Sequence, residues 1–212
     1  AIERFGDGVC HATLLEYLDE ELKRFGITPE RRVAERERMA LSVSTLIAWF
    51  AERAALGAAV YRERKGVLRV GDTDLSGIAD RIEVRGAQAA IWDFKTGVPA
   101  TKSQVETGLA PQLPLEAAML KRGAFEDTPA AQTTELGYWR FGGKEPTPKS
   151  LDLDAESEGE KALENLQALL ARYASPDQPF LSKPRVQFIK PYDDFDHLAR
   201  RKEWADAEGG DE

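Results

Sequence analysis

The sequence predicts an α/β fold in which helices flank a central mixed β-sheet, with a helical N-terminal part and a C-terminal helix. Three observations predict it. Residues 1–57 carry apolar side chains at helical spacing, and from residue 58 strand-like segments alternate with glycines. An amphipathic segment then precedes one further strand. This order favours a mixed sheet with a crossover helix over a helical bundle or a sandwich.

The N-terminal part is predicted to be helical throughout. "AIERF" resembles the end of a helix, and a second helix leads to a stop at Gly26. Pro29 is then suited to the first turn of a long helix that ends near Arg53. The apolar stripe expected on this long helix consists of Val33, Met39, Leu41, Val43, Leu46, Ile47 and Phe50.

Residues 58–143 are expected to hold the central sheet and its crossover helix. Glycines 66, 71, 77 and 86 are predicted to separate the strands of an antiparallel meander. A further strand ends at Gly97, and a loop leads to a helix with Pro114 in its first turn. "TTELGYWRF" is predicted to be the next strand.

Residues 144–160 are predicted to form an acidic, solvated loop, and 161–212 a helix, a short strand and a tail. We expect all four segments to belong to a single domain that is a fragment of a larger protein. With 212 residues, 42% of them hydrophobic, the chain can bury a substantial core. No membrane-spanning or signal segment is seen, so a cytoplasmic location is expected.

The formal charge of −8 does not exclude a polyanionic partner. Residues 150–160 and 203–212 each hold five acids and no base. Setting these ten aside leaves 27 of the 37 acids against 29 bases, a net charge of about +2 for the remainder. The lone Cys10 excludes a multi-cysteine iron–sulfur site built from this chain alone.

Charged residues lie on strand faces that should be apolar. Alternation places Ile78, Asp80 and Ile82 on one face of their strand, with Ala79, Arg81 and Glu83 on the other. In the next strand Ala89, Ile91, Asp93 and Lys95 share a face, opposite Ala90, Trp92 and Phe94. Burial of such charges costs several kcal/mol unless they pair or bind an ion. The simplest reading of Asp93 and Lys95 is a structural ion pair on a sheet edge.

Two carboxylates and a lysine at strand ends are also the components of a magnesium site for phosphodiester hydrolysis. Mg²⁺ takes one or two protein carboxylates and completes its octahedron with water and substrate phosphate. The ion lowers the pKa of a bound water, and a nearby ammonium can stabilise charge in the transition state.

The combination of "GIADRIE", "DFKTG" and a following helix with "QLPLEAAML" resembles the PD-(D/E)XK nuclease superfamily of the RecB kind, with its restriction-endonuclease-like core. "KPRVQFIKPYDDFDHLARRKEW" is similar to the C-terminal end of AddB-type subunits of bacterial AddAB helicase–nucleases. The resemblance covers most of the chain. Nucleases of the RecB kind usually have a histidine in their first helix that helps bind the metal. The resemblance implies that this histidine lies just upstream of residue 1.

The resemblance implies that Asp80 and Asp93 are metal ligands, together with the carbonyl of Phe94. It implies that Lys95 is the catalytic lysine and that Gln112 reaches into the site from its helix. Arg81 and Glu83 match the motif but face away from Asp80, and they could form a structural ion pair or contact DNA. Glu116 stands where relatives often have tyrosine, and its role stays open.

The leading hypothesis is therefore a Mg²⁺-dependent DNA nuclease, in which Mn²⁺ could substitute. The resemblance implies exonucleolytic cleavage of one strand of helicase-unwound DNA during double-strand break repair, with an AddA-type helicase–nuclease partner. One alternative is an inactive nuclease-like scaffold or DNA-binding module within a helicase complex. Another is an unrelated α/β domain with a surface ion pair.

Overall fold

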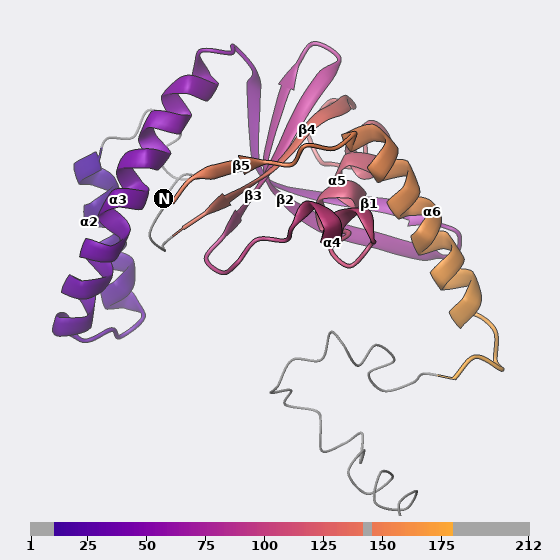
Figure 1. Ribbon diagram of the computed structural model, residues 1–212, viewed down its shortest axis with the longest axis horizontal. Helices are drawn as coiled ribbons and strands as arrows, with labels where there is room; N and C mark the ends of the chain where they lie inside the picture. Colours follow the sequence, from indigo (N-terminus) through magenta and orange to yellow (C-terminus); the bar gives the residue numbers. More distant parts are fainter. Residues whose placement is uncertain (1–10, 142–145, 180–212) are drawn as a thin grey trace, which may run out of the picture. The chain divides into compact units, whose positions relative to one another are not determined.

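The computed structural model describes residues 11–141 and 146–179, and it contains one five-stranded sheet. Strands β1 (Ala59–Val70), β2 (Thr73–Arg85) and β3 (Gln88–Lys95) are antiparallel. Strand β4 (Gln132–Arg140) is parallel to β3, and β5 (Pro148–Ser150) is antiparallel to β4 (Figure 1). The mixed sheet that the sequence predicts is confirmed.

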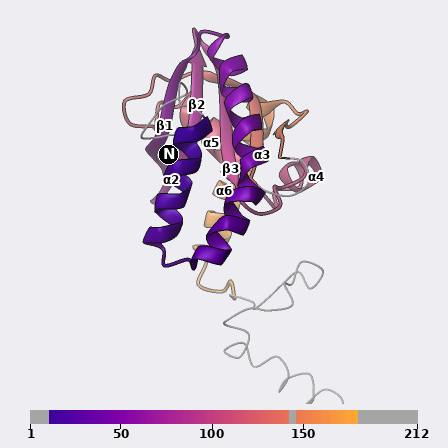
Figure 2. The same cartoon turned by 90° about the vertical axis from the view of Figure 1, so that its left-hand side faces the viewer.

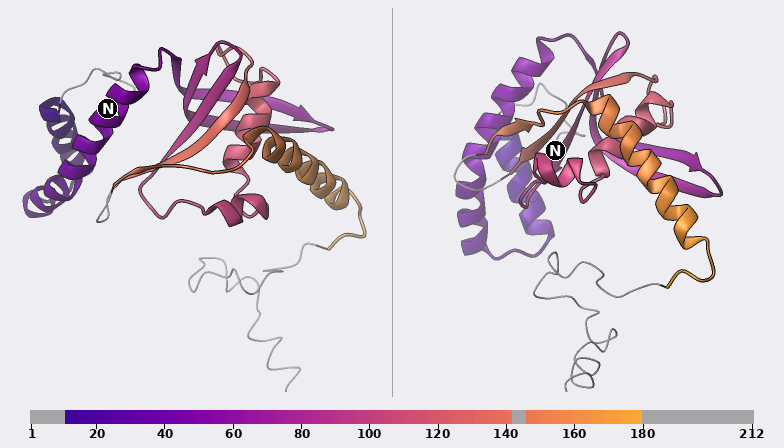
Figure 3. Two further views of the ribbon diagram at one scale, coloured as in Figure 1. Left: turned by 45° about the horizontal axis from the view of Figure 1, so that its top comes forward. Right: turned by 45° about the vertical axis from the view of Figure 1, so that its right-hand side comes forward.

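Helices cover the two faces of this sheet. Helix α5 (Gln112–Lys121) belongs to the crossover from β3 to β4 and packs through Leu113 and Ala117 on Ile82 and Ile91. Helix α3 (Pro29–Ala54) packs on the opposite face, where Trp49 and Phe50 meet Trp92 and Trp139 (Figure 3). The side chains of β3 alternate between these two cores, which places β3 between α5 and α3.

The predicted N-terminal helices are present in the described residues. Helix α2 (His11–Arg24) ends before Gly26, whose φ of 70° suits glycine, and α3 begins at Pro29. The two helices run side by side and share a small core of Leu14, Leu15 and Val43 (Figure 2). The expectation for Val33 was wrong, because this residue is 60% exposed. The "AIERF" helix lies outside the described residues.

The hairpin of β1 and β2 has fewer breaks than its glycines predict. Gly71 and Gly86 are in turns with positive φ, but Gly66 and Gly77 pair with each other inside the strands. A Cβ atom on Gly66 would lie 2.6 Å from Phe125 Cδ1. Gly66 therefore permits close packing of the hairpin on the segment after α5 and does not end a strand.

The alternation of side chains is interrupted at Glu63 in β1 and at Asp80 in β2. Beyond these two residues, each strand presents its other face to α5. These two residues oppose each other in the register without forming a ladder pair, and Glu63 has a φ of 48°. Ala79 and Ile82 lie in the same core, although strict alternation would place them on opposite faces. The expectation that Ala79 shares a face with Arg81 was therefore wrong, and Ile78 is half exposed.

The segment after β4 is more ordered than its acidic composition predicts. The loop expected at 144–160 was wrong, because β5 forms within it and α6 (Ala155–Tyr173) begins there. Leu151 and Ala155 are buried in the α5-side core, which explains the order of this segment. A short helix, α4 (Lys102–Glu106), was also not predicted. It starts with a capping box between Thr101 and Gln104.

The chain divides into two compact units between Ala168 and Leu169, inside α6. The first unit holds the whole sheet. In the second, Arg172 Nε donates a hydrogen bond of 2.7 Å to Gln178 Oε1 just after the helix. The predicted late strand within 183–191 and the last helix lie outside the described residues.

Candidate active site

The site lies where β2 and β3 separate. Their ladder ends at the pair Arg81 and Trp92, so the next position on each strand is Asp80 and Asp93. Instead of a further ladder bond, Asp80 Oδ2 accepts a hydrogen bond of 2.7 Å from the backbone N–H of Phe94. The separation of the strands thus brings the two predicted acids to neighbouring positions.

Strand β3 presents Asp93 and Lys95 to the α5 side, as alternation predicts. Ala89 and Ile91 lie in the core beneath α5, whereas Ala90 and Trp92 lie in the core beneath α3. Lys95 Nζ is 2.9 Å from each oxygen of Asp93, with its hydrogen bond to Oδ1. The side chain of Asp93 is almost fully buried, and that of Lys95 is 37% exposed.

Helix α5 contributes Gln112 from its first residue. Gln112 Nε2 donates to Asp93 Oδ1 at 2.7 Å, and Gln112 Oε1 accepts from Lys95 Nζ at 3.0 Å. Gln112 therefore bridges the acid and the lysine through opposite ends of its amide. The predicted residues Asp80, Asp93, Lys95 and Gln112 converge from two strands and one helix.

Glu116, one turn further along α5, completes this network. Its Oε1 accepts a hydrogen bond of 3.1 Å from Gln112 Nε2, and the residue is only 5% exposed. Both N–H groups of the Gln112 amide are thus directed at carboxylates, while its carbonyl is directed at an ammonium. A flipped amide would oppose acceptor to acceptor and donor to donor, so Glu116 fixes the orientation of Gln112 together with Asp93 and Lys95.

Burial and mutual repulsion raise the pKa values of acids in this site. Burial, and then the charge of Asp93, raise the pKa of Asp80, although the Phe94 N–H bond lowers it. Burial is also the main reason that the pKa of Glu116 rises to about 8, with Asp93 and Asp80 adding to it. A protonated Glu116 would reduce the charge that this cluster carries at neutral pH.

Tyr138 is a member of the site that sequence reasoning missed. It lies opposite Asp93 in the parallel ladder of β3 and β4, in the core beneath α5. Burial and the charges of Asp93 and Glu116 raise the pKa of its phenol to about 12. The signal was present, because alternation in "TTELGYWRF" places Tyr138 on the face of Leu136.

Arg81 and Glu83 lie on the opposite face and form a structural ion pair. Arg81 is fully buried, and its Nε donates to Glu83 Oε1 at 2.7 Å. Glu83 also accepts from Arg53 of α3, and the Arg81 guanidinium lies over the rings of Trp49 and Phe50. Of the two roles left open for these residues, contact with DNA is excluded by this burial.

The donor atoms of the site fit a hard divalent cation. Asp93 Oδ2 and Glu116 Oε2 are buried without a hydrogen-bond partner, although Oδ2 has the Lys95 ion pair. Within 11–141 and 146–179, no group of three or more His, Cys, Asp or Glu side chains could hold a metal ion. A metal site here would therefore use two carboxylates, those of Asp80 and Asp93. Mg²⁺ usually takes one or two protein carboxylates, so this number suits it.

The carbonyl of Phe94 is the third predicted ligand. Because the N–H and C=O of an extended residue point to the same side of the strand, we expect this carbonyl to face β2, as the N–H does. The ladder with β2 has already ended at that point. The carbonyl is then available beside Asp80.

Comparison with protein families gives a match to the PD-(D/E)XK nuclease superfamily over residues 2–185, which is most of the chain. The chain belongs to this superfamily. Asp80, Asp93 and Lys95 lie within the matched range, and they meet where β2 and β3 separate.

The curated relatives are much longer proteins from Rickettsia. An uncharacterized protein of Rickettsia typhi is 41% identical over 130 residues, which is 59% of this chain and 14% of the relative. An uncharacterized protein of Rickettsia felis is 39% identical over 87 residues, which is 37% of this chain and 10% of the relative. This PD-(D/E)XK domain thus spans about a tenth of the length of these relatives.

Among solved structures, the crystal structure of SSO0001 matches 74% of this chain and 70% of its own, at 15% identity and a TM-score of 0.30. Across the described helices of this PD-(D/E)XK domain, none has the length and apolar character required to cross a membrane.

Proposed function

We propose that this domain is a divalent-metal-dependent deoxyribonuclease that hydrolyses phosphodiester bonds. Membership of the PD-(D/E)XK superfamily supports nuclease activity. The observation that carries the proposal is the hydrogen-bonded network of Asp93, Lys95 and Gln112, with Asp80 held beside it by the backbone N–H of Phe94. An inactive scaffold would not need to retain all four groups at one site.

Each residue has a distinct role in this proposal. Asp80 and Asp93 hold the cation, with the Phe94 carbonyl beside Asp80. Lys95 stabilises negative charge that builds up on the phosphate oxygens as water attacks phosphorus. The P–O bond to the leaving sugar breaks, and the proton of the attacking water is finally carried by the leaving hydroxyl. Gln112 holds Lys95 and Asp93 in a fixed relative position.

The cation supplies charge neutralisation at the phosphate and a water of lowered pKa. Mg²⁺ is the cation we propose, with Mn²⁺ as a substitute, because the ligands are hard oxygens. In the metal-free protein, Lys95 supplies the positive charge that Asp93 needs for burial.

The resemblance to AddB-type domains supports a finer proposal. The substrate is one strand of DNA unwound by a helicase, and cleavage is exonucleolytic, in double-strand break repair. An AddA-type helicase–nuclease subunit would be the partner. Outside the acidic residues 150–160 and 203–212 the chain is near neutral, which is consistent with a domain that receives its DNA from a larger assembly.

The test uses the chain with end-labelled single-stranded and duplex DNA, in Mg²⁺, Mn²⁺ or EDTA. We expect cleavage in either metal and none in EDTA, with loss of at least 100-fold in Asp93→Asn. Release of mononucleotides or short products from one labelled end would support exonucleolytic cleavage, and internal cuts would contradict it.

The matched control is Asp72→Asn in the turn between β1 and β2, because Asp72 is exposed and lies outside the network. If DNA is bound but never cleaved, by this chain and by the longer protein that contains it, the scaffold alternative holds and the nuclease proposal fails.

A further inference from the structure

A second cation lies beside Lys95 at the end of β4. Arg140 is the ladder partner of Lys95, and Tyr138 is the ladder partner of Asp93. Tyr138 lies in the core beneath α5, and Arg140 follows it by two residues, so alternation places Arg140 on the same face. Neighbouring strands are about 4.8 Å apart, so the two cations adjoin each other.

Arg140 has no anionic partner in the part of the chain that the structure describes. Its Nε is buried and makes no hydrogen bond, and the residue is half-buried. By contrast, Arg53 contacts Glu83 and Glu135, and Arg69 contacts Asp74. The charges of these two arginines are compensated within the fold, whereas no ion pair compensates that of Arg140 within the described residues.

This arrangement is unfavourable for the isolated fold. Two like charges on facing positions of adjacent strands destabilise a sheet, and a buried donor without an acceptor adds a further penalty. Asp93 offsets the charge of Lys95 alone. An anion from outside the chain would compensate for both penalties.

The cationic row continues onto β5. Lys149 is the ladder partner of Tyr138. Leu151, two residues after Lys149, is buried in the same core as Tyr138. Lys149 is exposed and has no ion pair within the described residues. Strands β3, β4 and β5 thus each contribute one cation, Lys95, Arg140 and Lys149, to one face of the sheet.

We propose that Arg140, flanked by Lys149, binds a backbone phosphate of nucleic acid adjacent to the phosphate held at Asp93 and Lys95. The inference rests on the proposed nuclease function, and it assigns the direction in which the bound strand leaves the site. The planar guanidinium can form two parallel hydrogen bonds to phosphate oxygens, which the point charge of lysine does not reproduce. The strand then crosses β3, β4 and β5 on the α5 side.

The test measures binding of a fluorescein-labelled single-stranded oligonucleotide by anisotropy in EDTA, where metal-dependent hydrolysis does not occur. We expect Arg140→Gln to raise Kd about 10-fold and to reduce the slope of log K against log salt by about 0.7, the value for one phosphate contact on a single strand. Arg140→Lys should keep the slope, with a Kd between those of the wild type and Arg140→Gln.

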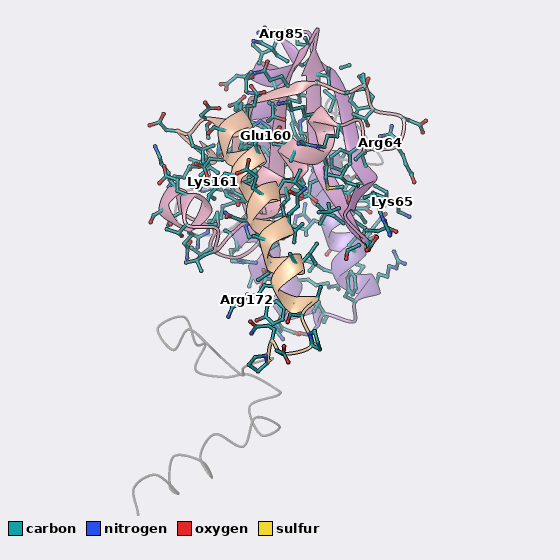
Figure 4. The ribbon with its side chains drawn as sticks, turned by 90° about the vertical axis from the view of Figure 1, so that its right-hand side faces the viewer. Arg64, Lys65, Arg85, Glu160, Lys161 and Arg172 are labelled. Carbon is teal, nitrogen blue, oxygen red and sulfur yellow. The ribbon has the colours of Figure 1, made fainter. Side chains whose placement is uncertain are left out.

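Arg85→Gln is the matched control, since it removes the same charge at the far end of β2, beside the turn to β3 (Figure 4). We expect the Kd and slope of this variant to equal those of the wild type. Thermal unfolding checks the fold, and Arg140→Gln should unfold at or above the wild-type temperature. Equal Kd and slope in Arg140→Gln and wild type, or equal losses in Arg140→Gln and Arg85→Gln, would overturn the inference.

The two proposals fail in different ways. If the chain binds DNA through Arg140 but shows no hydrolysis with Mg²⁺ or Mn²⁺, the nuclease function fails and the phosphate contact stands. If hydrolysis occurs and Arg140→Gln leaves Kd and salt slope unchanged, the nuclease function stands and Arg140 has no role in binding.

Discussion

The backbone N–H of Phe94 donates a hydrogen bond of 2.7 Å to Asp80 Oδ2, at the point where β2 and β3 separate. One side chain thereby replaces a ladder bond and fixes the position of a carboxylate against the neighbouring strand. Burial, and then the charge of the adjacent Asp93, raise the pKa of Asp80, although the Phe94 hydrogen bond lowers it. On balance the metal-free site disfavours the ionised form of Asp80.

The first prediction concerns Asp80→Asn. An acid with a raised pKa destabilises the folded state once pH exceeds its unfolded value, so removing the charge should help the metal-free fold. At pH 7 without metal, Asp80→Asn should unfold at or above the wild-type temperature, because asparagine can still accept from Phe94. The stabilisation that MgCl₂ gives the wild type should be lost, as measured by thermal unfolding with and without Mg²⁺. A variant that is still stabilised by Mg²⁺ as strongly as the wild type would contradict a role for Asp80 as ligand.

The second prediction concerns Glu116 as a positioning residue that acts through Gln112. Glu116→Leu should lower kcat about 10-fold with little change in KM, because the Gln112 amide loses the contact that orients it. In a Gln112→Ala background the same substitution should change kcat less than about 2-fold. Glu164→Leu, an exposed glutamate of α6, serves as the control. Equal effects of Glu116→Leu in both backgrounds would show that Glu116 acts independently of Gln112.

The third prediction concerns the backbone at Glu63. A left-handed conformation costs a non-glycine residue about 1–2 kcal/mol, and Glu63 has a φ of 48° within a strand. Glu63→Gly and Glu63→Ala both remove the contacts of the Glu63 side chain. The difference between their stabilities therefore reports the cost of the backbone conformation. We expect the glycine variant to be more stable by about 1 kcal/mol in urea unfolding, the reverse of the usual order inside strands. Greater stability of the alanine variant would disprove the requirement for a bend at this position.

The fourth prediction concerns the acid end of the stability profile. Hydrogen bonds from Arg122 and Lys121 on or beside α5 lower the pKa of Glu160, which lies on α6, to about 2 (Figure 4). Because the folded value lies below the unfolded value of 4.5, this group stabilises the fold above pH 4.5 and loses that contribution as pH falls toward 2. Glu160→Gln should therefore show a shallower loss of stability between these values. Glu164→Gln is the control, and an unchanged slope in Glu160→Gln would contradict the role of this ion pair. The effect should be small, because these side chains are partly exposed.

Much of the site could be predicted because β3 follows strict alternation. Asp93 and Lys95 share a face with Ala89 and Ile91, and Gln112 begins a helix that covers this face. Strand β2 could not be predicted in the same way, because its change of face at Asp80 depends on a left-handed residue in the partner strand. No local pattern marks Glu63 as that residue.

Two further elements show where composition misleads. The acids of residues 150–160 suggested a solvated loop, but Leu151 and Ala155 are buried between them and Asp154 Oδ1 accepts from the N–H of Ser157 at the start of α6. Arg140 gave no signal in the sequence, since its significance depends on the parallel register that pairs it with Lys95. Both the order of residues 150–160 and the position of Arg140 beside Lys95 depend on contacts between distant segments, which the local periodicity of the sequence does not show.

The measurement that tests the central claim most directly compares DNA cleavage and Mg²⁺ binding in Lys95→Met, with Lys65→Met on β1 as the control for loss of a lysine (Figure 4). If Lys95 acts on the phosphate while Asp80 and Asp93 hold the cation, Lys95→Met should bind Mg²⁺ at least as tightly as the wild type in calorimetry. Its cleavage rate should fall at least 100-fold, and Lys65→Met should retain both properties. Cleavage by Lys95→Met at the wild-type rate would contradict the account.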